Sequence, residues 1–220
     1  MQETIRTFRK WLTKSHKNYQ EELDAAHSLF WEEREDVEPI EYNQDTEMFF
    51  NEWLMLDFPV NGFDNIPARE RVNFINVFLK ENKSRLSKSA QIFAKNASES
   101  FLSFYKVVDV KPEEYTNLKD LFFGNQIRSV DINLSRGACI GQIICGRFCQ
   151  NEKGKYIAAG SQNITIPEKL FEILSRLIRG TYQLTINSGE EIKFEEFLKW
   201  NSYIYYREIT AAKERRGDLF

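Results

Sequence analysis

A block of short β-type runs, residues 100–165, lies between two stretches that show helical periodicity. Because the helical stretches bracket the strands instead of alternating with them, the pattern indicates an α+β fold and excludes a doubly wound parallel sheet. We expect N-terminal helices and C-terminal helices packed around a small, strongly curved antiparallel β-sheet or barrel of the OB/SH3-like kind. The chain then divides into a helical region (1–99), a β-module (100–166) and a C-terminal helical region (167–220), all in one compact body.

Turn residues divide the block into strands. Gly124-Asn125 is a two-residue turn of the kind that tolerates positive φ, so the runs on either side of it are expected to pair as a hairpin. The run 138–149 is apolar at both odd and even positions, which is typical of a central strand covered on both faces. The predicted strands are 101–110, 118–123, 126–134, 138–149, 155–159 and 163–166.

All three cysteines, Cys139, Cys145 and Cys149, fall on the predicted central strand. At about 3.3 Å per residue the outer two would lie roughly 30 Å apart, which is too far for a single metal ion to bridge. We therefore expect buried, reduced thiols. The odd number of cysteines also argues against the disulfide framework of a secreted protein.

Apolar residues recur at helical spacing before the block. Residues 3–34 are expected to form one long amphipathic helix that carries His16 and His27 as packing residues and not as ligands. Pro67 is suited to the first turn of a helix whose apolar stripe begins at Val72. Two further helices are expected over residues 46–58 and 86–97.

After the block, Pro167 and Gly180 mark the expected start and end of another helix. Residues 182–186 alternate between apolar and polar, which predicts a short strand. The spacing of Ser, Gly, Glu and Glu over 188–191 is that of a capping box and predicts that the last helix begins there.

Charge is distributed unevenly along the chain. Residues 1–20 carry a basic excess of about four, whereas residues 21–47 carry an acidic excess of about ten. We expect the acidic segment 32–47 to be a solvated loop; a docking surface for a basic partner is the alternative. Since the chain has neither a signal-peptide core nor an apolar run long enough to span a bilayer, we expect a cytoplasmic protein that does not use a membrane.

Two parts of the chain resemble a known family. The run 49–58 (FFNEWLMLDF) is similar to the Phe-Trp-Asp helix of an uncharacterised bacterial family often found alongside SEC-C zinc-binding motifs. The β-region that follows this helix in the family is similar to three runs of this chain, 104–110, 118–121 and 141–147. The chain has Gln142 where the pattern expects an acidic residue, and it lacks the Cys-rich zinc motif. The family has no established activity, so the resemblance implies a fold and no chemistry.

Four residues are candidate binding residues: Trp53, Asp57, Asp120 and Arg147. Asp57 places a carboxylate at the negative end of a helix dipole, so it needs an ion pair or loop amides from 61–65, or else it is a functional carboxylate. Arg147 interrupts an apolar strand; if it points inward it needs a partner such as Asp57, Asp120 or Asp131, and if it points outward it marks a polar face. Trp53 has the helical spacing of a core residue, with a ligand platform as the alternative.

No Gly-rich phosphate loop, nucleophile elbow or paired Cys or His motif occurs in the chain. We therefore expect a non-enzymatic protein-binding or adaptor module without a cofactor or a metal ion. A protein partner is favoured over nucleic acid, because residues 100–165 have a basic excess of only about two.

Two other functions stay open. Nucleic acid would bind if five basic residues gathered on one face beside Tyr105 or Tyr156, namely Arg128, Arg136, Arg147, Lys153 and Lys155. A metal-dependent enzyme would use a group of carboxylates, namely Asp57, Asp109, Asp120 and Asp131.

Overall fold

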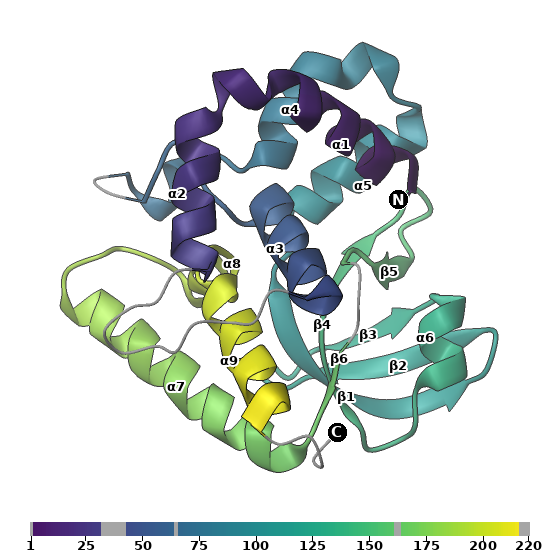
Figure 1. Ribbon diagram of the computed structural model, residues 1–220. Coiled ribbons are helices and arrows are strands. Elements are labelled where there is room, and N and C mark those ends of the chain that lie inside the picture. The colour runs from purple at the N-terminus through teal and green to yellow at the C-terminus, as the bar shows by residue number, and fades with distance from the viewer. Residues whose placement is uncertain (1, 32–42, 64–65, 161–163, 216–220) are drawn as a thin grey trace.

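The strands of the central block close into a small barrel (Figure 1). A computed structural model describes residues 2–31, 43–63, 66–160 and 164–215. Going round the barrel, β1 pairs with β2, β2 with β3, β3 with β5, β5 with β4, and β4 again with β1, while β6 adds to the side of β4. The strands are β1 (Leu102–Lys111), β2 (Tyr115–Asp120), β3 (Gln126–Ser129), β4 (Ile143–Gln150), β5 (Tyr156–Ala158) and β6 (Ile164–Ile166).

The connectivity is that of the OB fold. Each pairing is antiparallel except that of β3 with β5, and the short helix α6 (Ile132–Gly137) lies between β3 and β4. A five-stranded Greek-key barrel of this kind was one of the two predicted forms of the β-module. The expected α+β fold, with helices around a small barrel, is confirmed.

Alternate residues of the longest strands supply two separate cores. Tyr105, Val107 and Phe148 pack inside the barrel. Phe104 and Cys145 point the other way and join a larger core that the helices share. Because side chains alternate along a strand, one strand serves both cores, which explains why the β4 region is apolar at odd and even positions.

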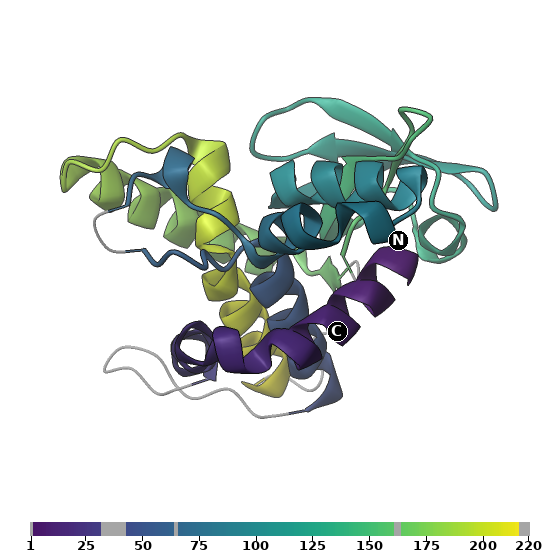
Figure 2. The same cartoon turned by 90° about the horizontal axis from the view of Figure 1, so that it is seen from above.

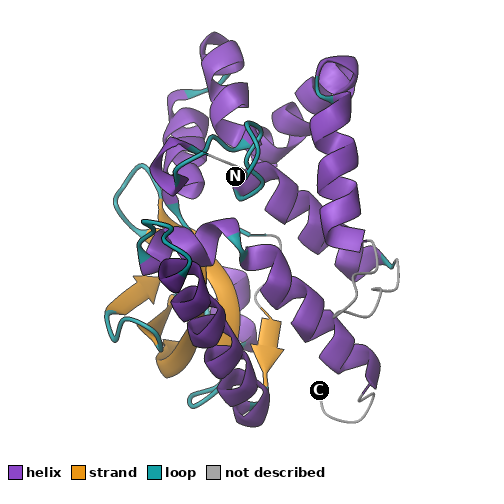
Figure 3. Ribbon diagram, turned by 90° about the vertical axis from the view of Figure 1, so that its left-hand side faces the viewer, coloured by secondary structure: helices purple, strands orange, loops and turns teal. Residues whose placement is uncertain are grey.

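Helices cover one side of the barrel. Figures 1 and 3 show the strands at one corner of the molecule and the helices above and beside them. Figure 2 shows α3 (Gln44–Leu56) and α9 (Ser202–Arg215) side by side, and the two helices are in contact. The other helices are α1 (Gln2–Ser15), α2 (Gln20–Trp31), α4 (Phe74–Asn82), α5 (Lys88–Glu99), α7 (Glu168–Asn187) and α8 (Phe194–Trp200). None of the described helices is long and apolar enough to cross a membrane.

The single helix predicted over 3–34 is wrong. A 3₁₀ turn over residues 16–18 separates α1 from α2, and His16 is exposed in it instead of packed. Tyr19 follows the turn and places its ring 5.6 Å from that of Trp11 and 5.5 Å from that of Phe74. Aromatic packing at this corner therefore outweighs the continuous helical pattern.

The third helix also begins later than predicted. Pro67 precedes a short 3₁₀ turn, and α4 starts only at Phe74, where the side chain of Asn73 accepts a hydrogen bond from the Asn76 amide. Val72, predicted on the apolar stripe, is 38% exposed. The asparagine cap sets the start of the helix here, and the proline does not.

The predicted end of a helix at Gly180 and the predicted strand over 182–186 are both wrong. α7 continues through Gly180, whose surroundings are open and whose backbone does not need a positive φ. Tyr182 and Ile186 are four residues apart and pack on the same core, so their spacing is helical as well as alternating.

The last helix does not begin at residues 188–191. α8 starts at Phe194, where the amide of Lys193 donates to the Glu196 carboxylate over 3.0 Å. A short turn at Asn201 then separates α8 from α9.

Three strand boundaries predicted within the block also need correction. The strand expected over 126–134 ends at Ser129, and α6 follows it. The central strand begins at Ile143, because the preceding residues form a turn in which Cys139 is exposed; Cys145 and Cys149 are buried as expected. The predicted pairing of the runs on either side of Gly124 is confirmed, but the predicted two-residue turn is wrong, because β2 ends at Asp120 and residues 121–125 form the loop.

The predicted acidic loop is only partly described. Residues 32–42 lie outside the described part of the chain. Residues 43–47 are not a loop: the Asn43 side chain accepts hydrogen bonds from two amides and caps the first turn of α3.

Candidate functional site

Arg147 and Asp57 form a buried ion pair between the barrel and the helices. β4 points Arg147 out of the barrel, and neither side chain is exposed to solvent. Asp57 ends α3 and accepts hydrogen bonds from Arg147 Nη2 and from the Ser202 hydroxyl. The other terminal nitrogen of Arg147 donates to the carbonyl of Ser100 over 2.6 Å. The predicted need of Arg147 for an acidic partner is thus met by Asp57.

A second carboxylate, that of Glu52, lies against the same guanidinium; we call Arg147, Asp57 and Glu52 the buried layer. Glu52 on α3 lies 3.6 Å from Nε of Arg147 and accepts a 2.7 Å hydrogen bond from the hydroxyl of Tyr206 on α9. Residues from three elements therefore meet around one guanidinium. Sequence reasoning missed Glu52, although a charge inside the apolar run of α3 is a signal that a partner is required.

Burial and charge act in opposite directions on the pKa values of this buried layer. Burial raises the pKa of Asp57, and the charges of Arg147 and Lys199 act against that rise. Burial lowers the pKa of Lys199 to about 8, and its amino group donates to the carbonyl of Ser98. The guanidinium and the two carboxylates link β4 with α3, although Arg147 Nε and Asp57 Oδ1 have no hydrogen-bond partner among the described residues.

Gly160 lies directly against this layer, and a larger residue there is expected to destabilise the fold. A methyl group on Gly160 would come within 2.6 Å of Oε2 and 2.7 Å of Cδ of Glu52. Since Glu52 is held by Arg147 and Tyr206, it cannot move aside without loss of those bonds. We expect Gly160→Ala to cost about 1–3 kcal/mol, measured by urea unfolding.

The matched control for Gly160→Ala is Gly180→Ala. Gly180 lies inside α7 with open space around it, so alanine is expected to stabilise the protein by about 0.5–1 kcal/mol. Equal effects of the two substitutions would contradict both the close contact with Glu52 and the continuation of α7.

Trp53 is placed in the core. It is fully buried, and its ring lies 5.5 Å from that of Phe30, 5.2 Å from that of Phe58 and 5.6 Å from that of Tyr203. Its indole N–H has no acceptor among the described residues. The geometry places Trp53 one helical turn before Asp57 but gives it no open face.

The four carboxylates of the enzyme hypothesis lie in four different settings. Asp57 pairs with Arg147, and Asp109 accepts from Asn117 on the outside of the barrel. Asp120 caps the turn after β2, and Asp131 caps α6. Among the described residues, no group of three or more His, Cys, Asp or Glu side chains is placed to hold a metal ion.

Asp120 lies at the end of the barrel beside a pocket of about 390 Å³. One oxygen of its carboxylate accepts the amides of Phe122 and Phe123 over 2.8 and 3.0 Å. Burial raises the pKa of Asp120, and these two amides act against that rise. The side chains of Tyr105 and Tyr156 also line the pocket.

The outer face of β1, β2 and β3 carries the second candidate site. Lys106 and Lys119 are directly opposite each other across the β1–β2 pair, so both project from the same face. Beside them, Arg128 places its guanidinium 4.3 Å from the ring centroid of Tyr115, and its Nε donates to Asn117 over 2.9 Å. No ion pair to a carboxylate is found for these three cations among the described residues.

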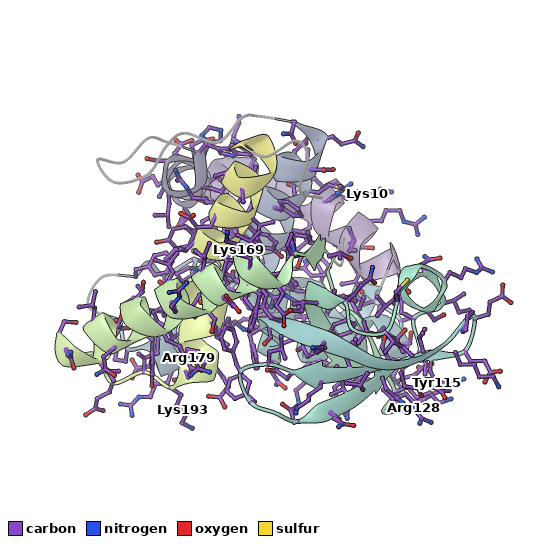
Figure 4. All side chains as sticks on the ribbon, turned by 90° about the horizontal axis from the view of Figure 1, so that it is seen from below. Lys10, Tyr115, Arg128, Lys169, Arg179 and Lys193 are labelled. Carbon is purple, nitrogen blue, oxygen red and sulfur yellow. The ribbon has the colours of Figure 1, made fainter. Side chains whose placement is uncertain are left out.

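Two further cations lie on the helical part of the molecule. Figure 4 shows Tyr115 and Arg128 on the barrel at one end of the view and Arg179 and Lys193 on the helices at the other end. The guanidinium of Arg179 on α7 lies 5.2 Å from the ring of Phe122, in the turn that follows β2. We call Lys106, Lys119, Arg128 and Tyr115 the basic barrel face.

The basic residues singled out in the sequence do not gather as that hypothesis required. Arg147 is buried against Asp57, and Arg136 pairs with Glu113 over 3.0 Å. Tyr105 is 6% exposed and belongs to the barrel core. Of that set, only Arg128 belongs to the basic barrel face. Lys106 and Lys119 were missed because their pairing depends on the β1–β2 register, which the sequence did not predict.

Comparison with known proteins shows a family match over most of the chain. The model of the Family of unknown function (DUF7986) matches residues 1–203. No curated protein and no solved structure matches the chain.

Proposed function

We propose that this chain, which belongs to the Family of unknown function (DUF7986), is a non-enzymatic binding module. Its basic barrel face binds single-stranded nucleic acid. The observation that carries the proposal is the cross-strand pair Lys106–Lys119 beside the stacked pair Arg128–Tyr115. The association with SEC-C motifs that the family resemblance implies stays a prediction.

The lysine pair favours an anionic ligand. Like charges directly opposite each other in an antiparallel pair destabilise a sheet by up to about 1 kcal/mol. Lys106 and Lys119 occupy such a position, and no described carboxylate pairs with either. An anion that bridges the two ammonium groups would relieve their repulsion, which a phosphate of a nucleic-acid backbone does well.

Arg128 and Tyr115 favour a ligand that also has aromatic rings. The stacking on Tyr115 and the hydrogen bond from Nε to Asn117 hold the guanidinium in place and leave its terminal nitrogens without a partner among the described residues. A guanidinium held in this way can donate to phosphate, and its plane and the Tyr115 ring can stack with bases. An acidic protein segment would use the charges but would leave this stacking surface unused.

The face also has a suitable place in the fold. In OB barrels the surface around the second and third strands is where oligonucleotides bind. Here β2 runs from Tyr115 to Asp120, so the face is about 17 Å long at about 3.3 Å per residue. This length fits the low end of the site size of an OB barrel, roughly 4 nucleotides.

The charge count that favoured a protein partner averages over residues that the fold separates. The excess of about two over residues 100–165 includes Arg147, which is buried, and the carboxylate of Asp120, which faces the other side of the strand from Lys119. Asp109 is the carboxylate that shares the outer face, where it accepts a hydrogen bond from Asn117, so three cations stand against one carboxylate among the described residues there. The charge on one face, and not the total, sets the local attraction. A protein partner with an acidic segment remains the competing occupant, and binding measurements on charge-reversed variants separate the two.

Charge reversal on the barrel face is expected to abolish salt-sensitive binding of a single strand. Fluorescence anisotropy with labelled 12-nucleotide dT and rU oligomers, at several salt concentrations, compares the wild type with Lys119→Glu/Arg128→Glu. We expect at least a tenfold loss of affinity at low salt. The slope of log affinity against log salt should fall by about 1.4, because each of the two cations that is removed neutralises one phosphate and each such phosphate of a single strand adds about 0.7 to the slope.

The control is Lys10→Glu/Lys14→Glu, which changes the net charge by the same amount on α1; Figure 4 shows Lys10 apart from Tyr115 and Arg128. The affinity of this control variant for the oligomers is expected to stay within twofold of that of the wild type. An equal loss in both variants would mean that the whole charge, and not the face, attracts nucleic acid. No binding by the wild type at low salt would overturn the proposal, and a co-purifying acidic protein lost only from the barrel-face variant would assign the face to a protein partner.

A further inference from the structure

The pocket at the end of the barrel has a chemistry opposite to that of the basic barrel face. It has a volume of about 390 Å³, and the described residues that line it include two carboxylates, Asp120 and Glu195, and no Lys, Arg or His. Five aromatic residues make up most of the rest of the lining: Phe101, Tyr105, Phe123, Phe148 and Tyr156. Acidic groups among aromatic faces attract organic cations.

Asp120 is the central group of this pocket. The residue is 2% exposed, and no ion pair or cation offsets its charge among the described residues. One of its oxygens accepts the amides of Phe122 and Phe123, and the Ser103 hydroxyl is a further donor whose interaction acts to lower the pKa of Asp120. The carboxylate is therefore fixed in orientation by the backbone and still has acceptor capacity, while its charge remains without a counterion.

The aromatic rings are held in position by one another. The rings of Tyr105 and Phe148 meet edge to face at 5.0 Å inside the barrel end, and those of Phe101 and Phe123 meet at 5.6 Å nearer the surface. Phe123 is 38% exposed, although a large aromatic side chain is usually buried. The pocket thus has a fixed aromatic wall and an exposed aromatic rim.

We propose that this pocket binds a guanidinium group. A planar guanidinium stacks on aromatic faces and donates two parallel hydrogen bonds to a carboxylate, so it uses both features of the pocket at once. The exposed Glu195 at the rim adds attraction for a cation. The proposal does not depend on nucleic-acid binding, because Asp120 and Lys119 are adjacent in β2 and point to opposite sides of the strand.

The test uses N-propylguanidinium as the probe and the uncharged N-propylurea as its isostere. Chemical shifts of the backbone amides of Phe123 and Asn125 report binding to the ¹⁵N-labelled full chain. We expect the guanidinium to bind at least tenfold more tightly than the urea. The affinity should fall on acidification as Asp120 takes up a proton, and burial favours that uptake because it raises the pKa of Asp120.

Asp120→Asn keeps an oxygen for the amides of Phe122 and Phe123 and removes the charge, so it tests the carboxylate without loss of the turn. It should lower the affinity for the guanidinium at least tenfold. Asp131→Asn is the matched control, since Asp131 also caps a backbone amide but lies outside the pocket, and it should change nothing. Phe123→Ala, at the exposed rim, should lower the affinity about threefold or more.

A third probe identifies the source of the group. If N-acetyl-arginine methylamide binds as tightly as N-propylguanidinium, the pocket accepts the arginine side chain of a protein partner. If the pocket excludes N-acetyl-arginine methylamide, the ligand is a free small molecule. Equal affinity for the guanidinium and the urea, or guanidinium binding unchanged in Asp120→Asn, would overturn the proposal. No shift of these amides at tens of millimolar probe would overturn it as well.

Discussion

Replacing Arg147 by methionine is expected to lower the free energy of unfolding by about 3–5 kcal/mol, because the substitution leaves two buried carboxylates without their cation. Asp57 is fully buried, and Glu52 is almost so. Methionine fills part of the volume and offers no charge. Urea unfolding followed by circular dichroism measures the change, and Arg128→Met, at an exposed position, should stay within about 0.5 kcal/mol of the wild type.

A double-mutant cycle separates the ion pair from the loss of packing. Asp57→Asn alone should also destabilise the protein, since it leaves Arg147 with a weaker acceptor. In the double variant Arg147→Met/Asp57→Asn the two losses should overlap, with a coupling free energy of about 1–3 kcal/mol. Additive losses would mean that the two side chains do not interact in solution.

Replacing Trp53 by alanine is expected to cost about 3–5 kcal/mol, because it opens a cavity between α2, α3 and α9. Trp53→Phe should cost much less, about 1–2 kcal/mol. The phenyl ring keeps most of the packing, and the substitution removes a buried indole N–H that has no acceptor among the described residues.

Trp53→Phe also tests whether Trp53 is a ligand platform, as the sequence left open. If the residue only packs, the variant should bind dT and rU oligomers and N-propylguanidinium with wild-type affinity. Unchanged stability together with lost binding of either ligand would make Trp53 part of a site, contrary to its position in the core.

The sequence predicted the parts of the fold that local pattern determines. The block of short runs forms a barrel in which the apolar residues pack either against one another or against the apolar faces of the helices that precede and follow the block. The apolar strand around Arg147 implied that an inward-facing guanidinium needs an acidic partner. Asp57, which the structure pairs with it, was one of the three partners named.

Features that depend on tertiary packing were not predictable in the same way. The helix break before Tyr19 depends on a ring that packs against α4, and the continuation of α7 through Gly180 depends on a core that accepts Tyr182 and Ile186 together. The basic barrel face needs the β1–β2 register, including its shift between Val107 and Asp109. Of that face only Arg128 was singled out in the sequence, whereas Lys106, Lys119 and Tyr115 carry no sequence signal of their own.

The most direct test of the proposed function is a ¹⁵N-chemical-shift titration of the full chain with a 12-nucleotide dT oligomer at low salt. We predict that the largest shifts fall on the amides of Lys106, Tyr115, Lys119 and Arg128, that they saturate, and that they reverse as salt is added. Shifts confined to the helices, or no shifts at an oligomer concentration of several hundred micromolar, would contradict the proposal that the basic barrel face binds single-stranded nucleic acid.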